Sequence, residues 1–142
     1  MSYTYEYPRP CVTTDVLIVT RQTNPKILLI QRGNEPYKGL WALPGGFVDM
    51  DEDLHTAALR ELKEETGIVD VSITQFKTYG SVDRDPRHRT ISIVYTASVN
   101  EPIKAQGMDD AIDAQWFEVG DLPNLAFDHQ TIIEEALLNL RK

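Results

Sequence analysis

A helix predicted between residues 53 and 66 carries acids on the face that it should bury. Asp51 or Asp53 is suited to cap its start, and Gly67 is suited to end it. At about 100° per residue, one apolar stripe consists of Leu54, Ala57, Ala58 and Leu62. The same arc, nearer the C-terminus, also holds Glu61, Glu64 and Glu65. Burying these carboxylates without partners would cost several kcal/mol each, so the chain must fold in a way that compensates them.

Two arrangements would resolve this conflict. The C-terminal end of the helix could project into water, with the glutamates as a solvated face. Alternatively, the carboxylates could converge on a hard divalent cation, because glutamates three and four residues apart lie on one side of a helix. Arg60 precedes Glu64 by four residues and could hold that side chain in place.

The segments on either side of this helix are typical of β-strands. Valine-rich or apolar runs predict strands over residues 11–20, 26–32, 71–79 and 90–97, with a short strand over 115–119. The turn signal Asn24-Pro25 predicts that the first two strands form a hairpin. Asp128 is suited to cap a last helix with an apolar stripe from Ile132 to Leu140. This order predicts an α/β or α+β sandwich, in which helices pack on a mixed β-sheet.

Composition excludes several classes of protein. The chain of 142 residues has the length of one domain, so we expect a single domain over residues 1–142. Its 14 basic and 22 acidic residues give a net charge of −8, which argues against nucleic-acid and anionic membrane partners. Cys11 is the only cysteine, and we find neither a signal peptide nor a membrane-spanning run. We therefore expect a reduced, soluble, cytoplasmic protein.

The acidic helix belongs to a longer motif. Gly46 is followed after five residues by Glu52, and after seven more by the run Arg60-Glu61-Leu62-Lys63-Glu64-Glu65-Thr66-Gly67-Ile68. This spacing matches the full Nudix box, G-x5-E-x7-R-E-U-x-E-E-x-G-U with U aliphatic. The sequence therefore resembles the Nudix hydrolases, and the box with its flanks covers most of the chain.

The resemblance implies an α/β/α sandwich that cleaves a diphosphate linked to a further group, with Mg²⁺ or else Mn²⁺ as cofactor. By motif position, the implied metal ligands are Glu61, Glu64, Glu65 and the carbonyl of Gly45. Glu52 and Arg60 would be structural partners within the box. The general base differs between members of this family. Glu61 is one candidate, and the other candidates are acids of the loop that holds Asp109, Asp110 and Asp113.

The flanks point to the ADP-ribose pyrophosphatase branch. Residues 31–49, 83–87 and 125–129 resemble that branch, which implies hydrolysis of ADP-ribose to AMP and ribose 5-phosphate. Basic residues that could contact its phosphates are Arg32, Lys38, Arg84 and Arg87. Aromatic residues that could stack on adenine, or else belong to the core, are Tyr37, Trp41 and Phe127. His129 is expected in the first turn of the last helix, near the ligand.

Two alternatives stay open at this point. The chain could be a Nudix pyrophosphatase for an oxidised nucleoside triphosphate or a dinucleotide cofactor. It could also be a non-catalytic domain that senses ADP-ribose, like that of related transcriptional regulators. Those regulators carry a winged-helix segment after the Nudix part, whereas this chain ends at Lys142, directly after the last helix. A homodimer is expected from similar proteins, although no feature of the sequence identifies an interface.

Overall fold

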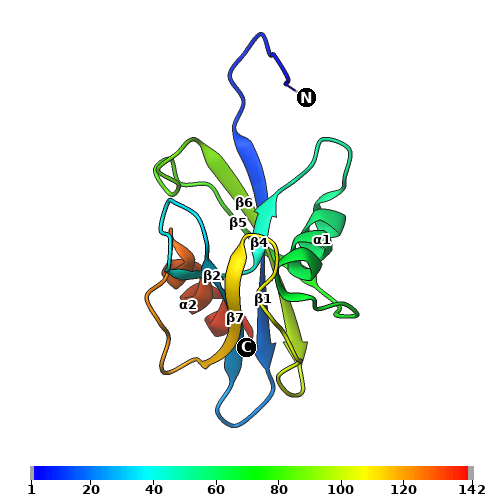
Figure 1. The fold of residues 1–142 in the computed structure, drawn as a ribbon, viewed down its shortest axis with the longest axis vertical. Helices are drawn as coiled ribbons and strands as arrows, with labels where there is room; N and C mark the ends of the chain where they lie inside the picture. Colours follow the sequence, from blue (N-terminus) through cyan, green and yellow to red (C-terminus); the bar gives the residue numbers. More distant parts are fainter. Residues whose placement is uncertain (1, 141–142) are drawn as a thin grey trace.

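The computed structural model describes residues 2–140. Their strands are β1 (Cys11–Thr20), β2 (Lys26–Arg32), β3 (Trp41–Ala42), β4 (Gly45–Phe47), β5 (Thr74–Tyr79), β6 (Thr90–Val99) and β7 (Ala111–Glu118). Their helices are α1 (Leu54–Thr66), between β4 and β5, and α2 (His129–Leu140), after β7. Residues 2–10 are exposed and extend away from the body of the molecule (Figure 1).

The strands form one mixed sheet of seven strands in the order β3-β2-β1-β6-β5, with β4 also paired to β1 and β7 to β2. β1 and β6 run parallel over ten residue pairs, from Cys11↔Thr90 to Thr20↔Val99. The other strand pairs are antiparallel. The predicted fold class, a mixed sheet with helices packed on it, is confirmed.

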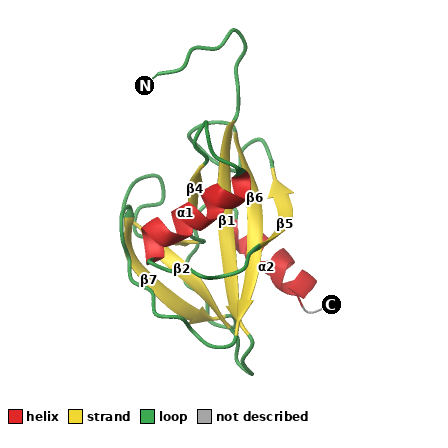
Figure 2. Cartoon of the chain, turned by 90° about the vertical axis from the view of Figure 1, so that its right-hand side faces the viewer, coloured by secondary structure: helices red, strands yellow, loops and turns green. Residues whose placement is uncertain are grey.

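The centre of β1 explains why the sheet is covered on both faces. Successive side chains of a strand point to opposite faces, so a strand covered on both sides is apolar without alternation. Val16 and Ile18 join a core cluster with Leu62 of α1, and Leu17 and Val19 join another with residues of α2. Figure 2 shows α1 and α2 on opposite sides of the sheet.

β1 and β2 separate soon after their connecting turn. Their pairing is Val19↔Ile27, and the predicted hairpin is therefore confined to its closed end. Further along, β4 pairs with β1 and β3 pairs with β2. Residues 43 and 44 thus pass between two diverging strands, and the site described below lies at this divergence.

The predicted boundaries of the acidic helix are confirmed. α1 starts after Asp53 and ends at Gly67, which has a left-handed φ of 78°. Asp53 occupies the N-cap position, but its carboxylate makes no capping hydrogen bond, so this part of the prediction is wrong. Asp128 likewise precedes α2, but its carboxylate accepts two hydrogen bonds from Arg84.

Three strands differ from their predicted lengths, and one of them, β6, runs to Val99 rather than residue 97. β5 begins at Thr74 rather than residue 71, because Asp70 adopts a left-handed φ of 60° and the ladder with β6 starts at Thr74↔Thr96. β7 starts at Ala111 rather than 115, since it pairs along almost the whole of β2. Its first residues include Asp113 and two alanines, which are poor local signals for a strand.

Candidate active site

A cavity of about 330 Å³ lies where β1 and β2 diverge, next to the C-terminal part of α1. Its wall combines residues from β1, β2, β3, β4, β6, α1 and α2 with residues of the loops between them. The residues of greatest chemical interest in this wall are Asp15, Arg32, Gly45, Glu61, Glu65, Arg84, Asp85, Arg87, Asp109, Asp110, Phe127 and His129. Acids and guanidinium groups from segments far apart in the sequence therefore line one cavity.

The glycines of β4 permit close contact between the sheet and α1. The Gly45 amide donates a 2.7 Å hydrogen bond to Oε1 of Glu65. A Cβ atom at Gly45 would lie 2.1 Å from the Thr14 carbonyl oxygen, and one at Gly46 would lie 2.5 Å from Cδ of Glu61. Real Cβ atoms do not approach other atoms so closely, so a Cβ at position 45 would clash with the backbone of β1, and one at position 46 would displace the Glu61 carboxylate.

Arg60 holds the acids of the box around one guanidinium group. Its Nε and Nη2 donate to both oxygens of Glu52, at 2.9 and 2.6 Å. Its Nη1 donates to Glu61 at 2.9 Å and to Glu64 at 3.1 Å, and Nη2 also donates to the Phe47 carbonyl. The hydrogen bonds from Arg60 lower the pKa of Glu52 to about 2. Glu52 and Arg60 thus have the structural contacts that the motif implies.

Glu61 and Glu65 differ from Glu64 in their burial. Glu65 is 7% exposed, and desolvation, opposed by the Gly45 hydrogen bond and reinforced by Glu61 and Asp15, raises its pKa to about 8. Burial also raises the pKa of Glu61, although Arg60 opposes this shift. The Glu64 side chain is 42% exposed and lies outside the cavity wall. Of the three glutamates predicted to converge, Glu61 and Glu65 line the cavity. Glu64 lies outside its wall and accepts a hydrogen bond from Arg60.

The donor set of the cavity fits a hard divalent cation. Within residues 2–140, no group of three or more Asp, Glu, His or Cys side chains already has a metal-binding arrangement. The reason is visible at Arg60, which engages the oxygens of Glu61 and Glu64 that a metal would need. Buried carboxylates without a full set of partners nevertheless favour a compensating cation, and oxygen ligands suit Mg²⁺ or Mn²⁺.

The two classes of general base both face the cavity. Glu61 lines it from α1, and Asp109 and Asp110 line it from the loop before β7. The carbonyl of Asp110 accepts a hydrogen bond from the Gly33 amide, and its carboxylate accepts one of 3.4 Å from Asn34. Asp113 does not line the cavity, because its oxygens bind the Ala114 amide and the Gln115 side chain.

A basic and aromatic wall faces the acids. The guanidinium carbons of Arg32 and Arg87 lie 4.9 and 5.7 Å from the ring centre of Phe127. Burial, together with repulsion from Arg87, lowers the pKa of Arg32. Asp85 binds Arg87 with both oxygens. Arg32, Arg87 and Phe127, all predicted to bind substrate, are thus brought together.

Arg84 and Tyr37 are placed differently from the prediction. Arg84 reaches the cavity wall, but its side chain is 4% exposed and both its Nε and Nη2 donate to Asp128. It is therefore engaged in a structural ion pair rather than free to bind phosphate. Tyr37 lies outside the wall and packs edge-on against Phe127, with 4.9 Å between ring centres.

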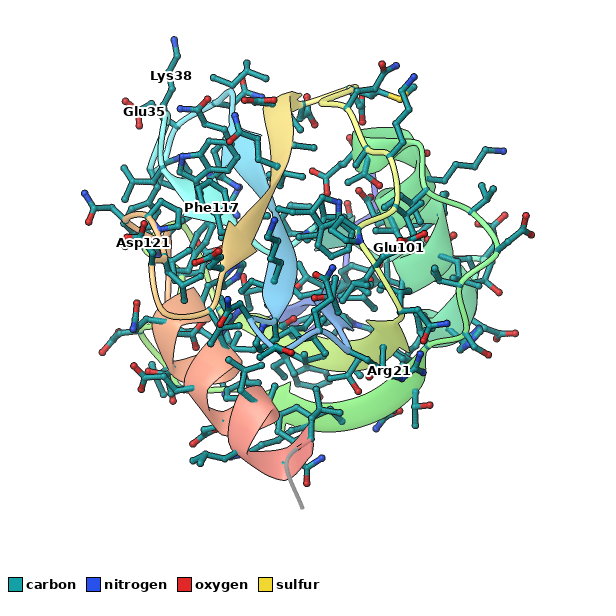
Figure 3. The ribbon with its side chains drawn as sticks, turned by 90° about the horizontal axis from the view of Figure 1, so that it is seen from below. Arg21, Glu35, Lys38, Glu101, Phe117 and Asp121 are labelled. Atoms are coloured by element: carbon teal, nitrogen blue, oxygen red, sulfur yellow. The ribbon has the colours of Figure 1, made fainter. Side chains whose placement is uncertain are left out.

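Lys38 and Trp41 do not line the cavity, and their role as substrate contacts stays a prediction. Lys38 is exposed, and Figure 3 shows its side chain at the periphery, next to Glu35. Trp41 packs edge-on against Phe117 at 4.8 Å between ring centres and belongs to the core beneath α2. Its position on β3 directs the ring away from the cavity, which is the core alternative that the sequence left open.

Three further residues of the cavity wall were not among the catalytic, substrate-binding or metal-ligating residues predicted from the sequence. Asp15 is 7% exposed within β1, and its carboxylate accepts a hydrogen bond from Ser92. An acid inside a run of buried apolar residues was a usable signal for a functional position. Asp85, 6% exposed, binds Arg87. His129 is 4% exposed, and its Nδ1 accepts a 3.0 Å hydrogen bond from the Leu43 amide.

A family model described as the NUDIX domain matches residues 10–136. The chain belongs to the Nudix family. The cavity of this Nudix protein is lined by the box residues Gly46, Glu61 and Glu65, and Arg60 links the box acids Glu52 and Glu64 to Glu61. The predicted family is therefore confirmed, and the match identifies a Nudix hydrolase.

Two curated relatives of this Nudix protein have informative names. An ADP-ribose pyrophosphatase from Methanocaldococcus jannaschii is 45% identical over 132 residues, which cover 92% of this chain and 75% of that protein. An ADPR responsive transcriptional repressor, NtrR, from Acinetobacter baylyi is 38% identical over 140 residues. That match covers 95% of this chain but 56% of the repressor. The rest of the repressor lies outside the matched region.

Solved structures agree with these relatives. The NUDIX domain of Shewanella oneidensis NrtR, complexed with ADP ribose, superposes with a TM-score of 0.88 at 36% identity, covering 94% of this chain and 90% of that one. A bifunctional NMN adenylyltransferase/ADP ribose pyrophosphatase from Francisella tularensis, complexed with AMP and a Mn ion, gives a TM-score of 0.83 at 33% identity. This chain spans 43% of the Francisella chain, and 95% of this chain is covered.

In the described part of this Nudix protein, no helix is long and apolar enough to cross a membrane.

Proposed function

We propose that this Nudix protein hydrolyses ADP-ribose to AMP and ribose 5-phosphate, with Mg²⁺ as the preferred cation and Mn²⁺ as a substitute. The observation that carries this proposal is that Glu61 and Glu65 share the wall of one cavity with Arg32 and Arg87. Such a cavity offers cation ligands and anion ligands to one molecule, as a diphosphate with its metal requires. The named activity of the Methanocaldococcus relative supports the choice of substrate.

Each side of the cavity has a distinct role in this proposal. Arg32 and Arg87 bind the diphosphate oxygens, and the face of Phe127 is available to a base or ribose. Glu61, Glu65 and the Gly45 carbonyl hold the cation, and Glu64 joins them if its carboxylate leaves Arg60. When bound, the cation neutralises charge on the bridging and leaving oxygens of the diphosphate.

We assign the general base to Asp110 rather than Glu61. The carboxylate of Glu61 is already held by Arg60, whereas that of Asp110 faces the cavity with one long contact from Asn34. Asp110 accepts a proton from water as the water oxygen attacks one phosphorus atom. The bond from that phosphorus to the bridging oxygen breaks, and the leaving phosphate keeps the electron pair.

The test is incubation with ADP-ribose, with and without Mg²⁺, followed by chromatography of the products. We expect AMP and ribose 5-phosphate in equal amounts, only when Mg²⁺ is present. An oxidised nucleoside triphosphate and a dinucleotide cofactor serve as competing substrates at the same concentration. Absence of AMP from ADP-ribose, with turnover of another member of the panel, would overturn the substrate and keep the reaction class.

A second candidate function is sensing of ADP-ribose without turnover, supported by the similarity to the Acinetobacter repressor. Calorimetry separates the two, because a sensor would bind ADP-ribose in the presence of Mg²⁺ and leave it intact. We favour the enzyme, since the box acids are all present and Arg60 orders them. The net charge of −8 supports a small nucleotide rather than a nucleic acid as partner. That residues 1–142 act as one domain, and as a homodimer, stays a prediction.

A further inference from the structure

The turn before α2 ties several walls of the cavity together. The backbone of Ala126 donates to the Trp41 carbonyl, the Phe127 ring lies near the guanidinium groups of two arginines, and Asp128 binds Arg84. Phe127 adopts a left-handed φ of 52°, a strained conformation for an aromatic residue. Strain of this kind persists where the surrounding contacts require it. His129 is the member of this turn to which neither the fold nor the proposed reaction assigns a role.

The contact of His129 fixes the state of its ring. Nδ1 lies 3.0 Å from the Leu43 amide nitrogen, which can only donate. Nδ1 must therefore be the acceptor, and a neutral imidazole then carries its proton on Nε2. Nε2 lies 3.9 Å from Oδ1 of Asp15, whose other oxygen accepts from Ser92. Burial lowers the pKa of His129, in agreement with a neutral ring.

The segment that His129 holds leads directly to the proposed cation site. Leu43 lies two residues before Gly45, and the intervening Pro44 carbonyl accepts a 2.8 Å hydrogen bond from the Val16 amide. The Gly45 amide then donates to Glu65. The backbone of residues 43–45 is thus hydrogen-bonded in turn to α2, to β1 and to α1. Its bond to α2 is made by the His129 side chain.

We propose that His129 is a positioning residue, whose Nε2-protonated ring holds the Leu43 amide and thereby sets the Gly45 backbone against Glu65 for cation binding. The effect on the cation rests on the proposed function, whereas the state of the ring does not. Removal of an outer partner of a metal ligand typically reduces metal affinity or activity by about 10- to 100-fold. His129 acts through Leu43 and need not touch the substrate.

The first test is nitrogen NMR of the full wild-type chain without metal or substrate. We expect the His129 ring to be the Nε2–H tautomer, and the Leu43 amide to be protected from hydrogen exchange. An Nδ1–H tautomer, or a rapidly exchanging Leu43 amide, would overturn the proposal. This measurement needs no variant and no activity, so it stands even if ADP-ribose is not a substrate.

The second test compares variants by their affinity for Mn²⁺ alone, read from the electron paramagnetic resonance signal of free Mn²⁺. We expect His129→Leu to weaken Mn²⁺ binding by about 10- to 100-fold. His129→Asn places an acceptor near the position of Nδ1 and should recover most of that loss. With ADP-ribose, we expect the Leu variant to lose kcat more than it raises KM.

Ile133→Ala is the matched control, because Ile133 is buried in α2 and lies outside the cavity wall. It should lower the free energy of unfolding and leave Mn²⁺ affinity within about threefold of wild type, well inside the outer-partner effect. Equal Mn²⁺ affinity in the Leu variant and wild type would overturn the proposal, as would an Asn variant no better than Leu. Failure of wild type to cleave ADP-ribose, with the Mn²⁺ differences intact, would overturn the proposed substrate alone.

Discussion

Glu65 is the residue in which the structural and the proposed chemical demands meet. Its Oε1 accepts the Gly45 amide hydrogen bond, which joins α1 to β4. Burial and the neighbouring acids raise its pKa to about 8, so its charged form lacks compensation inside the cavity. A buried carboxylate in such surroundings is a suitable ligand for a cation, because the cation would compensate its charge.

For Glu65→Gln we expect kcat for ADP-ribose to fall by at least about 100-fold, because a charged cation ligand is lost. The fold should persist, since the amide oxygen of glutamine can still accept the Gly45 hydrogen bond. Asp113→Asn is the control, as Asp113 lies outside the cavity wall. Steady-state kinetics and circular dichroism check both variants. Near-normal turnover in Glu65→Gln would contradict the metal role.

The Arg60–Glu52 pair predicts a specific acid sensitivity. The folded protein holds the pKa of Glu52 at about 2, below its ordinary value of 4.5. A depressed pKa contributes stability above the ordinary value, and this contribution is lost as the pH falls from about 4.5 through about 2. The free energy of unfolding of Glu52→Gln should therefore be lower than that of wild type at neutral pH. This difference should shrink as the pH falls across this window.

Urea unfolding at a series of pH values measures this difference. Glu101→Gln is a matched control, because Glu101 is an exposed acid in the loop after β6 (Figure 3). It should change stability by less than about 0.5 kcal/mol at any pH. A difference for Glu52→Gln that stays constant from neutral pH to pH 2 would contradict the linkage to Arg60.

At the scale of elements, the two glycines of β4 should fail in different ways. The Cβ of Gly45→Ala would meet the backbone oxygen of Thr14, which cannot move without separating β4 from β1. We expect a loss of stability of about 1–3 kcal/mol. The Cβ of Gly46→Ala would meet the carboxylate of Glu61, a flexible end that can shift. We expect a smaller loss of stability there but a large loss of activity.

Thermal unfolding and kinetics of the two alanine variants separate these outcomes. Gly120→Ala is the control, because a Cβ at that position meets no atom within 4 Å. It should leave both stability and activity close to wild type. Equal losses of stability at positions 45 and 46 would show that the Glu61 carboxylate does not move aside for the added Cβ.

The elements also show which predictions the sequence supports. α1 was predicted from local signals, since a periodic stripe and a terminal glycine are properties of neighbouring residues. β7 was predicted too short because its pairing with β2 joins segments about 85 residues apart, beyond any local pattern. The same limit explains the cavity. Glu61 and Glu65 could be predicted from the box, but the Asp15–Ser92 and His129–Leu43 contacts depend on the packing of segments far apart in the sequence.

For the whole molecule, cation binding should be visible as stability. A ligand that binds the folded state alone stabilises it by about 2.7 kcal/mol at 100 times its Kd. We therefore expect Mn²⁺ to raise the Tm of the wild-type protein by several degrees and that of Glu65→Gln by much less. Differential scanning calorimetry without substrate tests this, with Mn²⁺-free buffer as the reference. An equal shift in both proteins would indicate binding elsewhere.

The parallel pairing of β1 with β6 sets an order of events during synthesis. Cys11 pairs with Thr90, so the ten-residue ladder at the centre of the sheet needs a partner made 79 residues later. At about 5–20 residues per second, the ribosome needs roughly 4–16 s to supply it. During this interval the apolar run of β1 has neither its main partner nor the helix α2 to cover it. The nascent chain therefore exposes a central strand of its core throughout this interval, which is when a chaperone would be of greatest use to it.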